Sequence, residues 1–219
     1  THNAQYDSSK AHHTPEGFHN NYPGREPDMS DFFRWQWSRL LRDEPEQRAD
    51  LVPWQAVDLA QLNTTQGLSA TWLGHATVLL NSAGVRVLTD PIFSERASPV
   101  SWLGPKRLTA LPVDPARLPF VDAVVISHNH YDHLDLPSLR LLNAQAGGPP
   151  LFIVPLGNAA LLQIEGITNV KELDWWSSVT LKDDLRITLV PTQHWSKRRL
   201  LGDRNEALWG GYVLQHQGR

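Results

Sequence analysis

Side chains that bind metal ions are concentrated in residues 127–133, which read Ser-His-Asn-His-Tyr-Asp-His and directly follow an apolar run. Residues two apart on an extended chain point to the same side, so His128 and His130 can converge on one metal ion. Asp132 and His133 lie past a turn and can face a second ion beside the first. Imidazole and carboxylate groups are zinc ligands. This segment therefore predicts a metal site.

A third ligand for the first ion is available at His194, just after the strand-like run 185–190. Three histidines with an open fourth position hold a catalytic zinc that activates water. The alternative is a polar loop whose histidines bond to the backbone, as a lone histidine would. The clustering of ligand-type side chains favours the metal.

Composition restricts the remaining chemistry. The 219 residues include no cysteine, which excludes disulfides, thiolate zinc sites, iron–sulfur clusters and cysteine nucleophiles. Lys and Arg number 20 and Asp and Glu 23, and this net charge of −3 argues against a nucleic-acid partner. No apolar run approaches the roughly 20 residues of a membrane-spanning helix, and no signal-peptide core opens the chain. We expect a soluble or peripherally membrane-associated chain of undetermined compartment.

The chain divides into three parts. Residues 1–28 are polar and aperiodic, which predicts an arm that lies on the surface or is partly disordered. Residues 29–68 predict an amphipathic helix and a linker. Residues 69–219 alternate β-like and helical patterns, which predicts an α/β layered domain without a regular βαβ rhythm. The expected strands are 70–73, 77–80, 85–89, 123–126, 151–154, 170–173, 179–181, 185–190 and 208–214, and the expected helices 136–142 and 158–164.

The predicted amphipathic helix has two interpretations. It begins near Ser30 or Asp31 and ends before Pro45. Aromatic residues interleaved with arginines are found on membrane-surface helices. Docking of the helix on the domain through its aromatics is the commoner case, because aromatic side chains are usually buried. The residues concerned are Phe32, Phe33, Trp35 and Trp37 with Arg34, Arg39 and Arg42.

The metal-ligand segment resembles the signature of the metallo-β-lactamase fold superfamily, His-x-His-x-Asp-His after a hydrophobic strand. Motifs along nearly the whole chain resemble the N-acylphosphatidylethanolamine-hydrolysing phospholipase D branch of that superfamily. The motifs are specific for the branch and less so for its substrate. They are Trp-Leu-Gly-His-Ala-Thr at 72–77, Leu-Thr-Asp-Pro-Ile-Phe-Ser-Glu-Arg-Ala-Ser-Pro at 88–99, Gly-Pro-Lys-Arg at 104–107, Leu-Asp-Trp-Trp at 173–176, Leu-Trp-Gly-Gly at 208–211 and His-His-Thr-Pro-Glu-Gly-Phe at 12–18.

The resemblance implies a four-layer αβ/βα sandwich with two zinc ions at the sheet edge. His128, His130 and His194 would hold one zinc, and Asp132 and His133 the other, with a hydroxide between them as the nucleophile. The implied reaction is hydrolysis of N-acylphosphatidylethanolamine to N-acylethanolamine and phosphatidic acid. The zinc ions would activate the water and clamp a phosphate oxygen. His130 and Asp132 are the implied catalytic residues, and Asp132 is also a candidate orienting base.

The family pattern has two further ligands, an aspartate that bridges both ions and a later histidine. The acids Asp203 and Glu206 precede the last strand instead of following it, and we do not expect His216 to substitute. We therefore expect this chain to cover mainly the N-terminal half of the sandwich and to leave a large apolar sheet face open. A second copy of the chain or a C-terminal segment would complete it.

Further residues are candidates for orienting the ligands or contacting the substrate. Asp90 either orients a ligand histidine or forms an Asp-Pro turn. His75 either contacts the metal-ligand segment, residues 127–133, or has only a packing role. Lys197 and Arg198 either meet an anionic headgroup or lie in a solvated loop. Trp195 belongs either to an apolar rim for an acyl chain or to the core.

Two other functions remain open at this point. One is metal-dependent hydrolysis of another ester, lactone or phosphodiester in the same fold. The other is a catalytically incomplete fragment that acts as a binding or assembly module. Adding the expected downstream segment distinguishes the two classes: restored hydrolysis would indicate an enzyme, and no hydrolysis would indicate a binding or assembly module.

Overall fold

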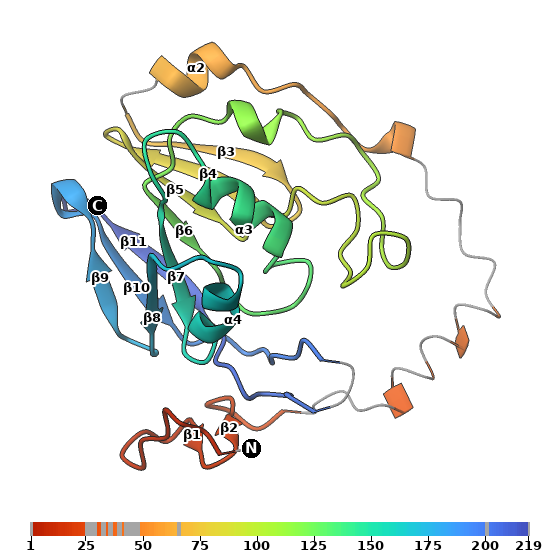
Figure 1. Cartoon of the computed structure of the whole chain (residues 1–219), viewed down its shortest axis with the longest axis vertical. Helices are drawn as coiled ribbons and strands as arrows, with labels where there is room; N and C mark the ends of the chain where they lie inside the picture. Colours follow the sequence, from red (N-terminus) through yellow and green to blue (C-terminus); the bar gives the residue numbers. More distant parts are fainter. Residues whose placement is uncertain are drawn as a thin grey trace.

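A six-stranded sheet forms the centre of the computed structural model (Figure 1). The structure describes residues 2–24, 30–31, 34, 37–38, 41, 49–64, 67–199 and 202–218. Strands β3 to β5 are antiparallel and β5 to β8 are parallel, in the order β3-β4-β5-β6-β7-β8. The bounds are β3 Ser69–Gly74, β4 Thr77–Ser82, β5 Val85–Thr89, β6 Ala123–Val125, β7 Leu151–Pro155 and β8 Val170–Leu173.

A second, antiparallel sheet of three strands has the order β11-β10-β9. A short pair, β1 and β2, lies in the N-terminal arm. The strands are β1 His13–Thr14, β2 Gly17–Phe18, β9 Ser178–Thr180, β10 Arg186–Val190 and β11 Gly211–Gln215. The helices are α2 Leu59–Thr64, α3 Leu136–Asn143 and α4 Ala159–Ile164, with 3-10 turns η1 Ala49–Leu51, η2 Pro115–Arg117 and η3 Lys182–Asp184.

The centre of the six-stranded sheet is buried on both faces. Side chains alternate across a strand, so in β6 Val124 joins the core beneath α3 and α4, while Val125 joins the core between the two sheets. All three residues of β6 are buried, as expected for a central parallel strand. The layers are therefore helices, large sheet and small sheet. This confirms the predicted α/β layered fold.

The outer face of the three-stranded sheet is mostly polar. Thr188 pairs with Ser178 of β9 and Val213 of β11, and Arg186 pairs with Gln215. The side chains of these residues lie on the outer face of the sheet, because the alternate residues of the same strands are buried in the core between the sheets. The hydroxyls of Ser178 and Thr188 lie 2.9 Å apart. The expectation of a large apolar open face is therefore wrong for this sheet.

The strand predicted over residues 208–214 begins only at Gly211. Residues before it bond instead to the segments that follow β7 and β6, because Leu208 N–H donates to Leu156 O at 2.8 Å and Gly210 N–H donates to Ser127 O at 2.9 Å. These bonds join the two sheets next to the segment that carries the predicted metal ligands.

The predicted arm packs against the domain. Phe18 is 3% exposed and belongs to the core between the sheets, so the arm inserts a side chain into the domain instead of lying only on its surface. The helix predicted from residue 30 lies largely outside the described residues, including Phe32, Phe33 and Trp35. Its described residues are helical, and Trp37 is 65% exposed. No helix among the described residues combines the length and apolar character needed to span a membrane.

Candidate metal centre

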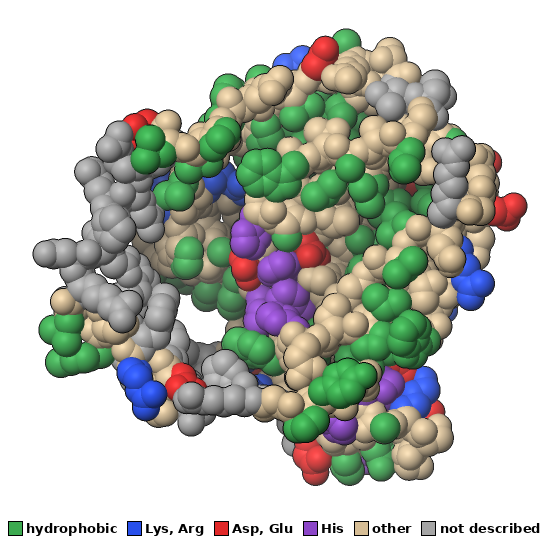
Figure 2. All heavy atoms as spheres, turned by 180° about the vertical axis from the view of Figure 1, so that it is seen from behind, with side chains coloured by type: hydrophobic (Ala, Val, Ile, Leu, Met, Phe, Trp, Pro, Cys, Tyr) green, Lys and Arg blue, Asp and Glu red, His purple; other side chains and the backbone are tan. Residues whose placement is uncertain are grey.

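The predicted ligands lie at one edge of the large sheet because three connections meet there. Strands β5 and β6 are parallel, so Asp90 and residues 127–133 follow their carboxyl ends at the same edge. Val78 of β4 pairs with Thr89, which brings the β3–β4 turn with His75 to that edge as well. Figure 2 shows the resulting patch of histidine side chains with acidic groups beside it.

The first ligand group consists of His128, His130 and His194. Nε2 of His128 lies 2.8 Å from Nδ1 of His130 and 3.0 Å from Nε2 of His194. One ligand atom from each residue lies within 4.8 Å of the others. The structure thus brings a histidine that follows β10 to the two histidines that follow β6, across the two sheets.

The second ligand group consists of Asp132 and His133 together with His75. Oδ2 of Asp132 lies 3.0 Å from Nε2 of His75 and 3.4 Å from Nε2 of His133. Gly74, with φ of 113°, and His75, with φ of 48°, form the turn that brings the His75 ring to this place. His75 therefore faces the second group directly and is a candidate ligand there.

Asp90 connects the two groups. Its Oδ1 accepts the Ser127 N–H at 2.7 Å, and its Oδ2 lies 2.7 Å from Ser127 Oγ and 2.8 Å from Nδ1 of His133. Ser127 Oγ donates to Asp90 and so accepts from Nδ1 of His128 at 2.8 Å. Because Nδ1 of His128 holds the proton, its Nε2 has a lone pair, which faces the rings of His130 and His194. Asp90 has φ of 34°, a costly conformation that is typical of functional positions.

The pKa values of the rings differ between the groups. Burial, with the neighbouring histidines, lowers the pKa of His128 to about 2 and that of His130 to about 4. Burial also lowers the pKa of His194. For His133, burial opposes the charge, but hydrogen bonds with Asp132 and Asp90 raise its pKa to about 9. The first group is therefore neutral at pH 7, as a metal requires, while His133 holds a proton that a metal would displace.

Both groups fit zinc in the chemistry of their donors. A neutral imidazole has one N–H and one lone pair, so three ring nitrogens in mutual contact are best satisfied by a cation that accepts all three lone pairs. His130 directs Nδ1 to this point, and its buried Nε2 has no hydrogen-bond partner among the described residues. A nitrogen and oxygen donor set without sulfur suits zinc.

The basic residues after His194 occupy two different environments. The Arg198 guanidinium donates to Asn129 O at 3.1 Å and Leu134 O at 2.8 Å, and it lies 4.2 Å from the centre of the Tyr131 ring. Arg198 therefore stabilises the conformation of the loop that carries the metal ligands. This role differs from both expectations for Arg198, which were contact with an anionic headgroup and a place in a solvated loop. The Lys197 N–H donates to Asn129 Oδ1 at 3.0 Å, and its ammonium group has no partner among the described residues.

The tryptophans near the ligand segments differ in burial. Trp195 packs its ring edge against His130, with ring centres 4.3 Å apart, and is half-buried beside the first group. Trp175 and Trp209 are buried in the core, and Trp176 is 69% exposed.

His216 takes no part in the centre. Its Nδ1 lies 2.7 Å from Ser82 Oγ and its Nε2 lies 2.7 Å from Asp183 O, at the opposite end of β4 from His75. Asp203 caps its own loop by accepting the N–H groups of Arg198 and Arg199. Neither residue replaces the bridging aspartate or the last histidine of the family pattern.

Another histidine and carboxylate group joins the arm to the domain. Asp174 accepts hydrogen bonds from Lys10 and from the Trp175 N–H, and it lies 2.7 Å from Nε2 of His12 and 3.1 Å from Nε2 of His13. These donors satisfy the carboxylate, so the group acts as a hydrogen-bonded clasp, named here the Asp174 clasp.

Asn20 is a functional candidate that the sequence analysis missed. Its Nδ2 donates to His194 O at 2.7 Å, and its Oδ1 accepts the His194 N–H at 3.0 Å. The polar arm gave no sign of this contact, because it joins residues 174 positions apart. The available signal was the His-His-Thr-Pro-Glu-Gly-Phe motif, which ends just before Asn20.

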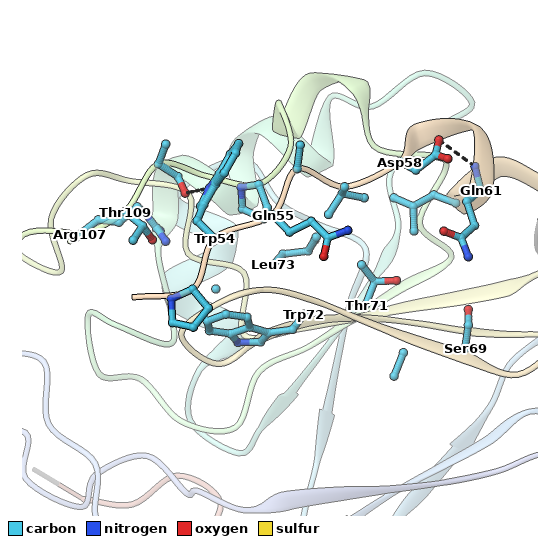
Figure 3. A pocket seen from close by; sticks show the side chains of 18 residues that line it. Trp54, Gln55, Asp58, Gln61, Ser69, Thr71, Trp72, Leu73, Arg107 and Thr109 are labelled. Carbon is cyan, nitrogen blue, oxygen red and sulfur yellow. Dashed lines mark hydrogen bonds between the residues drawn. The ribbon is translucent and has the colours of Figure 1, made fainter. Parts of the chain in front are cut away.

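A cavity of about 590 Å³ lies along the edge strand β3. Trp54 and Trp72 lie on opposite walls, with Arg107 at one end and Asp58 at the other (Figure 3). Nε1 of Trp72 donates to His75 O at 2.9 Å, so the cavity adjoins the turn that carries His75. Its volume is in the range of small-molecule sites.

Comparison with known proteins identifies similar chains. A family model described as a beta-lactamase superfamily domain matches residues 85–219. N-acyl-phosphatidylethanolamine-hydrolyzing phospholipase D 1 of Caenorhabditis elegans is 35% identical over 227 residues, which cover 97% of this chain and 62% of that protein. The mitochondrial N-acyl-phosphatidylethanolamine-hydrolyzing phospholipase D of Saccharomyces cerevisiae is 40% identical over 151 residues, which cover 68% of this chain and 31% of that protein.

The solved structures include an isothiocyanate hydrolase from Delia radicum gut bacteria. It has a TM-score of 0.50 and 28% identity, over 68% of this chain and 58% of that chain. The present chain therefore spans only part of the length of each of these proteins.

Proposed function

The chain belongs to the beta-lactamase superfamily, and we propose that it supplies the metal centre of a zinc-dependent phosphodiesterase. The observation that carries this proposal is the pair of ligand groups, His128, His130 and His194 on one side and Asp132, His133 and His75 on the other. The proposed substrate is N-acylphosphatidylethanolamine or a closely related phospholipid, hydrolysed to N-acylethanolamine and phosphatidic acid. The names of the two similar phospholipases support this choice.

Hydrolysis of a phosphodiester requires a nucleophile at neutral pH and relief of negative charge on phosphorus. Zinc ions bound by the two groups would lower the pKa of water and stabilise charge on a phosphate oxygen. Asp132, whose side chain is 39% exposed, would also orient the attacking water. Asp90 and Ser127 fix the ring orientations of His128 and His133, so the ligands need no rearrangement when the substrate binds.

The cavity along β3 supports a lipid substrate. Trp54 is 53% exposed and Trp72 is 60% exposed, and both donate their indole N–H to main-chain oxygens, so the ring faces stay available for an apolar chain. One acyl chain would lie in this cavity while the phosphate meets the metal centre. Contact with a membrane surface, absence of a nucleic-acid partner, and completion of the centre by a second copy or a further segment belong to the same proposal.

The first experiment is elemental analysis of the purified protein together with an assay of N-acylethanolamine release from mixed micelles. We expect two zinc ions per protein and release of N-acylethanolamine. His130→Ala should abolish turnover and lower the metal content, because it removes a ligand from the first group. A wild-type rate with full metal in His130→Ala would contradict the assigned site. Hydrolysis of a soluble lactone or aryl ester without lipid hydrolysis would contradict the substrate.

A further inference from the structure

We propose that the N-terminal arm, residues 2–24, is a positioning element of the metal centre that acts through Asn20 on the ligand His194. This inference rests on the proposed metal centre and not on its substrate. It gives a function to a segment whose composition predicts only a surface arm.

His194 lies in the irregular segment between β10 and β11, whose described residues, 191–199 and 202–210, belong to no strand. Among the described residues, the N–H and the C=O of His194 both bond to Asn20 alone. The Asn20 amide therefore bridges the two peptide groups that flank the His194 Cα. Because the ring position follows from this backbone, Asn20 determines where Nε2 of His194 stands relative to His128.

Asn20 is itself held firmly. Its Oδ1 also accepts Nε1–H of Trp209 at 3.2 Å, and Trp209 is fully buried. The neighbouring Tyr22 O accepts Nε2–H of Gln193 at 2.9 Å, which adds a second link to the same segment. Asn20 thus joins the ligand to the rigid core between the sheets.

The rest of the arm fixes the place of Asn20. The Phe18 N–H donates to Asn205 O at 2.8 Å, and Phe18 itself is buried in the core. A Cβ on Gly17 would lie 2.1 Å from Asn205 O, so the arm approaches the domain as closely as only glycine allows. Farther back, the Asp174 clasp ties Lys10, His12 and His13 to the end of β8. The arm is therefore attached to the domain both next to Asn20 and at its far end.

Asn20→Ala tests the proposal, with metal affinity as the readout. The zinc-loaded protein is titrated with a chelator, and the cobalt-substituted protein is examined by visible absorption, which reports ligand geometry. We expect zinc to be held about 10–100-fold less tightly at the first group, the range for groups that orient metal ligands. We also expect an altered cobalt spectrum.

The matched control is Asn169→Ala. Asn169 also donates its Nδ2 to a main-chain oxygen, Pro150 O at 2.9 Å, but it lies in the connection between α4 and β8. It should lower the thermal midpoint to a similar extent and leave zinc affinity unchanged. Asn20→Asp keeps the acceptor for His194 N–H but places a carboxylate oxygen against His194 O in place of the donor. Because the two acceptors repel each other, this variant should also lose zinc affinity.

Zinc affinity within twofold of wild type in both Asn20 variants, or an equal loss in Asn169→Ala, would overturn the proposal. Wild-type protein that binds no zinc would overturn the metal centre and this inference with it. Wild-type protein that binds zinc but hydrolyses no phosphodiester would contradict only the proposed function.

Discussion

Asp90 is the residue on which both ligand groups depend, because one carboxylate holds Ser127, and through it His128, as well as His133. Asp90→Asn keeps the shape of the side chain but loses the charge and one acceptor oxygen. We expect zinc affinity to fall about 10–100-fold, since the ligand rings lose their orientation. Chelator competition measures this effect.

The control for Asp90→Asn is Asp184→Asn. Asp184 also has a positive φ, 61°, and lies in the turn before β10, at the end of that strand opposite to the ligand His194. Asparagine tolerates this backbone region, so neither change should strain the main chain. Equal zinc affinity in the wild type and Asp90→Asn would show that Asp90 does not orient the ligands.

Lys197 is the remaining candidate for the substrate headgroup, because Arg198 is occupied by carbonyl oxygens of the metal loop. Lys197→Ala should raise KM for an anionic phospholipid severalfold and leave KM for a neutral soluble ester unchanged, since only the former has a charge to meet. Steady-state kinetics with the two substrates measure the difference. Lys171→Ala, an exposed lysine of β8, is the matched control. An equal change for both substrates would remove the headgroup role.

At the scale of elements, the docking of the arm should depend on pH. Burial lowers the pKa of His12 from 6.5, and this outweighs its contact with Asp174. Burial acts against the Asp174 charge, but hydrogen bonds from Lys10 and His12 lower the pKa of Asp174 from 3.8. The protein with the arm undocked therefore binds more protons, at His12 as well as at Asp174. Docking is weakened as the pH falls below about 6.5 through His12, and further below about 3.8 through Asp174.

Hydrogen exchange of the Phe18 amide measures this docking, because the amide is bonded to Asn205 O. After correction for intrinsic rates, we expect less protection at pH 5.5 than at pH 7.5. His12→Gln should lose this dependence, whereas His19→Gln, an exposed histidine of the same arm, should keep it. Equal protection at both pH values in the wild type would contradict the prediction.

At the scale of the whole molecule, the metal centre joins segments that are far apart in the sequence. Its candidate ligands come from the β3–β4 turn, the loop after β6 and the segment after β10, and so from both sheets. Zinc bound there should stabilise the folded state by about 2.7 kcal/mol at 100 times its dissociation constant. For a chain of this size, that corresponds to a rise in Tm of roughly 5–11 °C.

Thermal unfolding with and without a chelator measures this stabilisation. The Tm of the wild type should fall when the metal is removed, and the Tm of His130→Ala should change little. An unchanged Tm in the wild type, with the loss of metal verified by elemental analysis, would show that the metal does not hold the two sheets together.

The amino-acid sequence by itself determined the features that depend on near neighbours. Residues 128–133 are in one loop after a buried strand, so their spacing was enough to predict their meeting. The alternation of apolar and polar residues, together with short apolar runs, predicted most strands of the large sheet, because both patterns depend on which side chains of a strand are buried. The absence of cysteine set the donor chemistry.

Only the tertiary structure decided which distant residues meet. His75 faces Asp132, Asp90 joins His133 to Ser127, and Asn20 holds His194 because strand order and register bring several connections to one edge. Likewise, the pairing of β11 with β10 places His216 beside Ser82, at the end of β4 opposite to His75. The same pairing leaves the polar face of the three-stranded sheet on the outside. Such contacts depend on how whole layers pack, which local spacing does not encode.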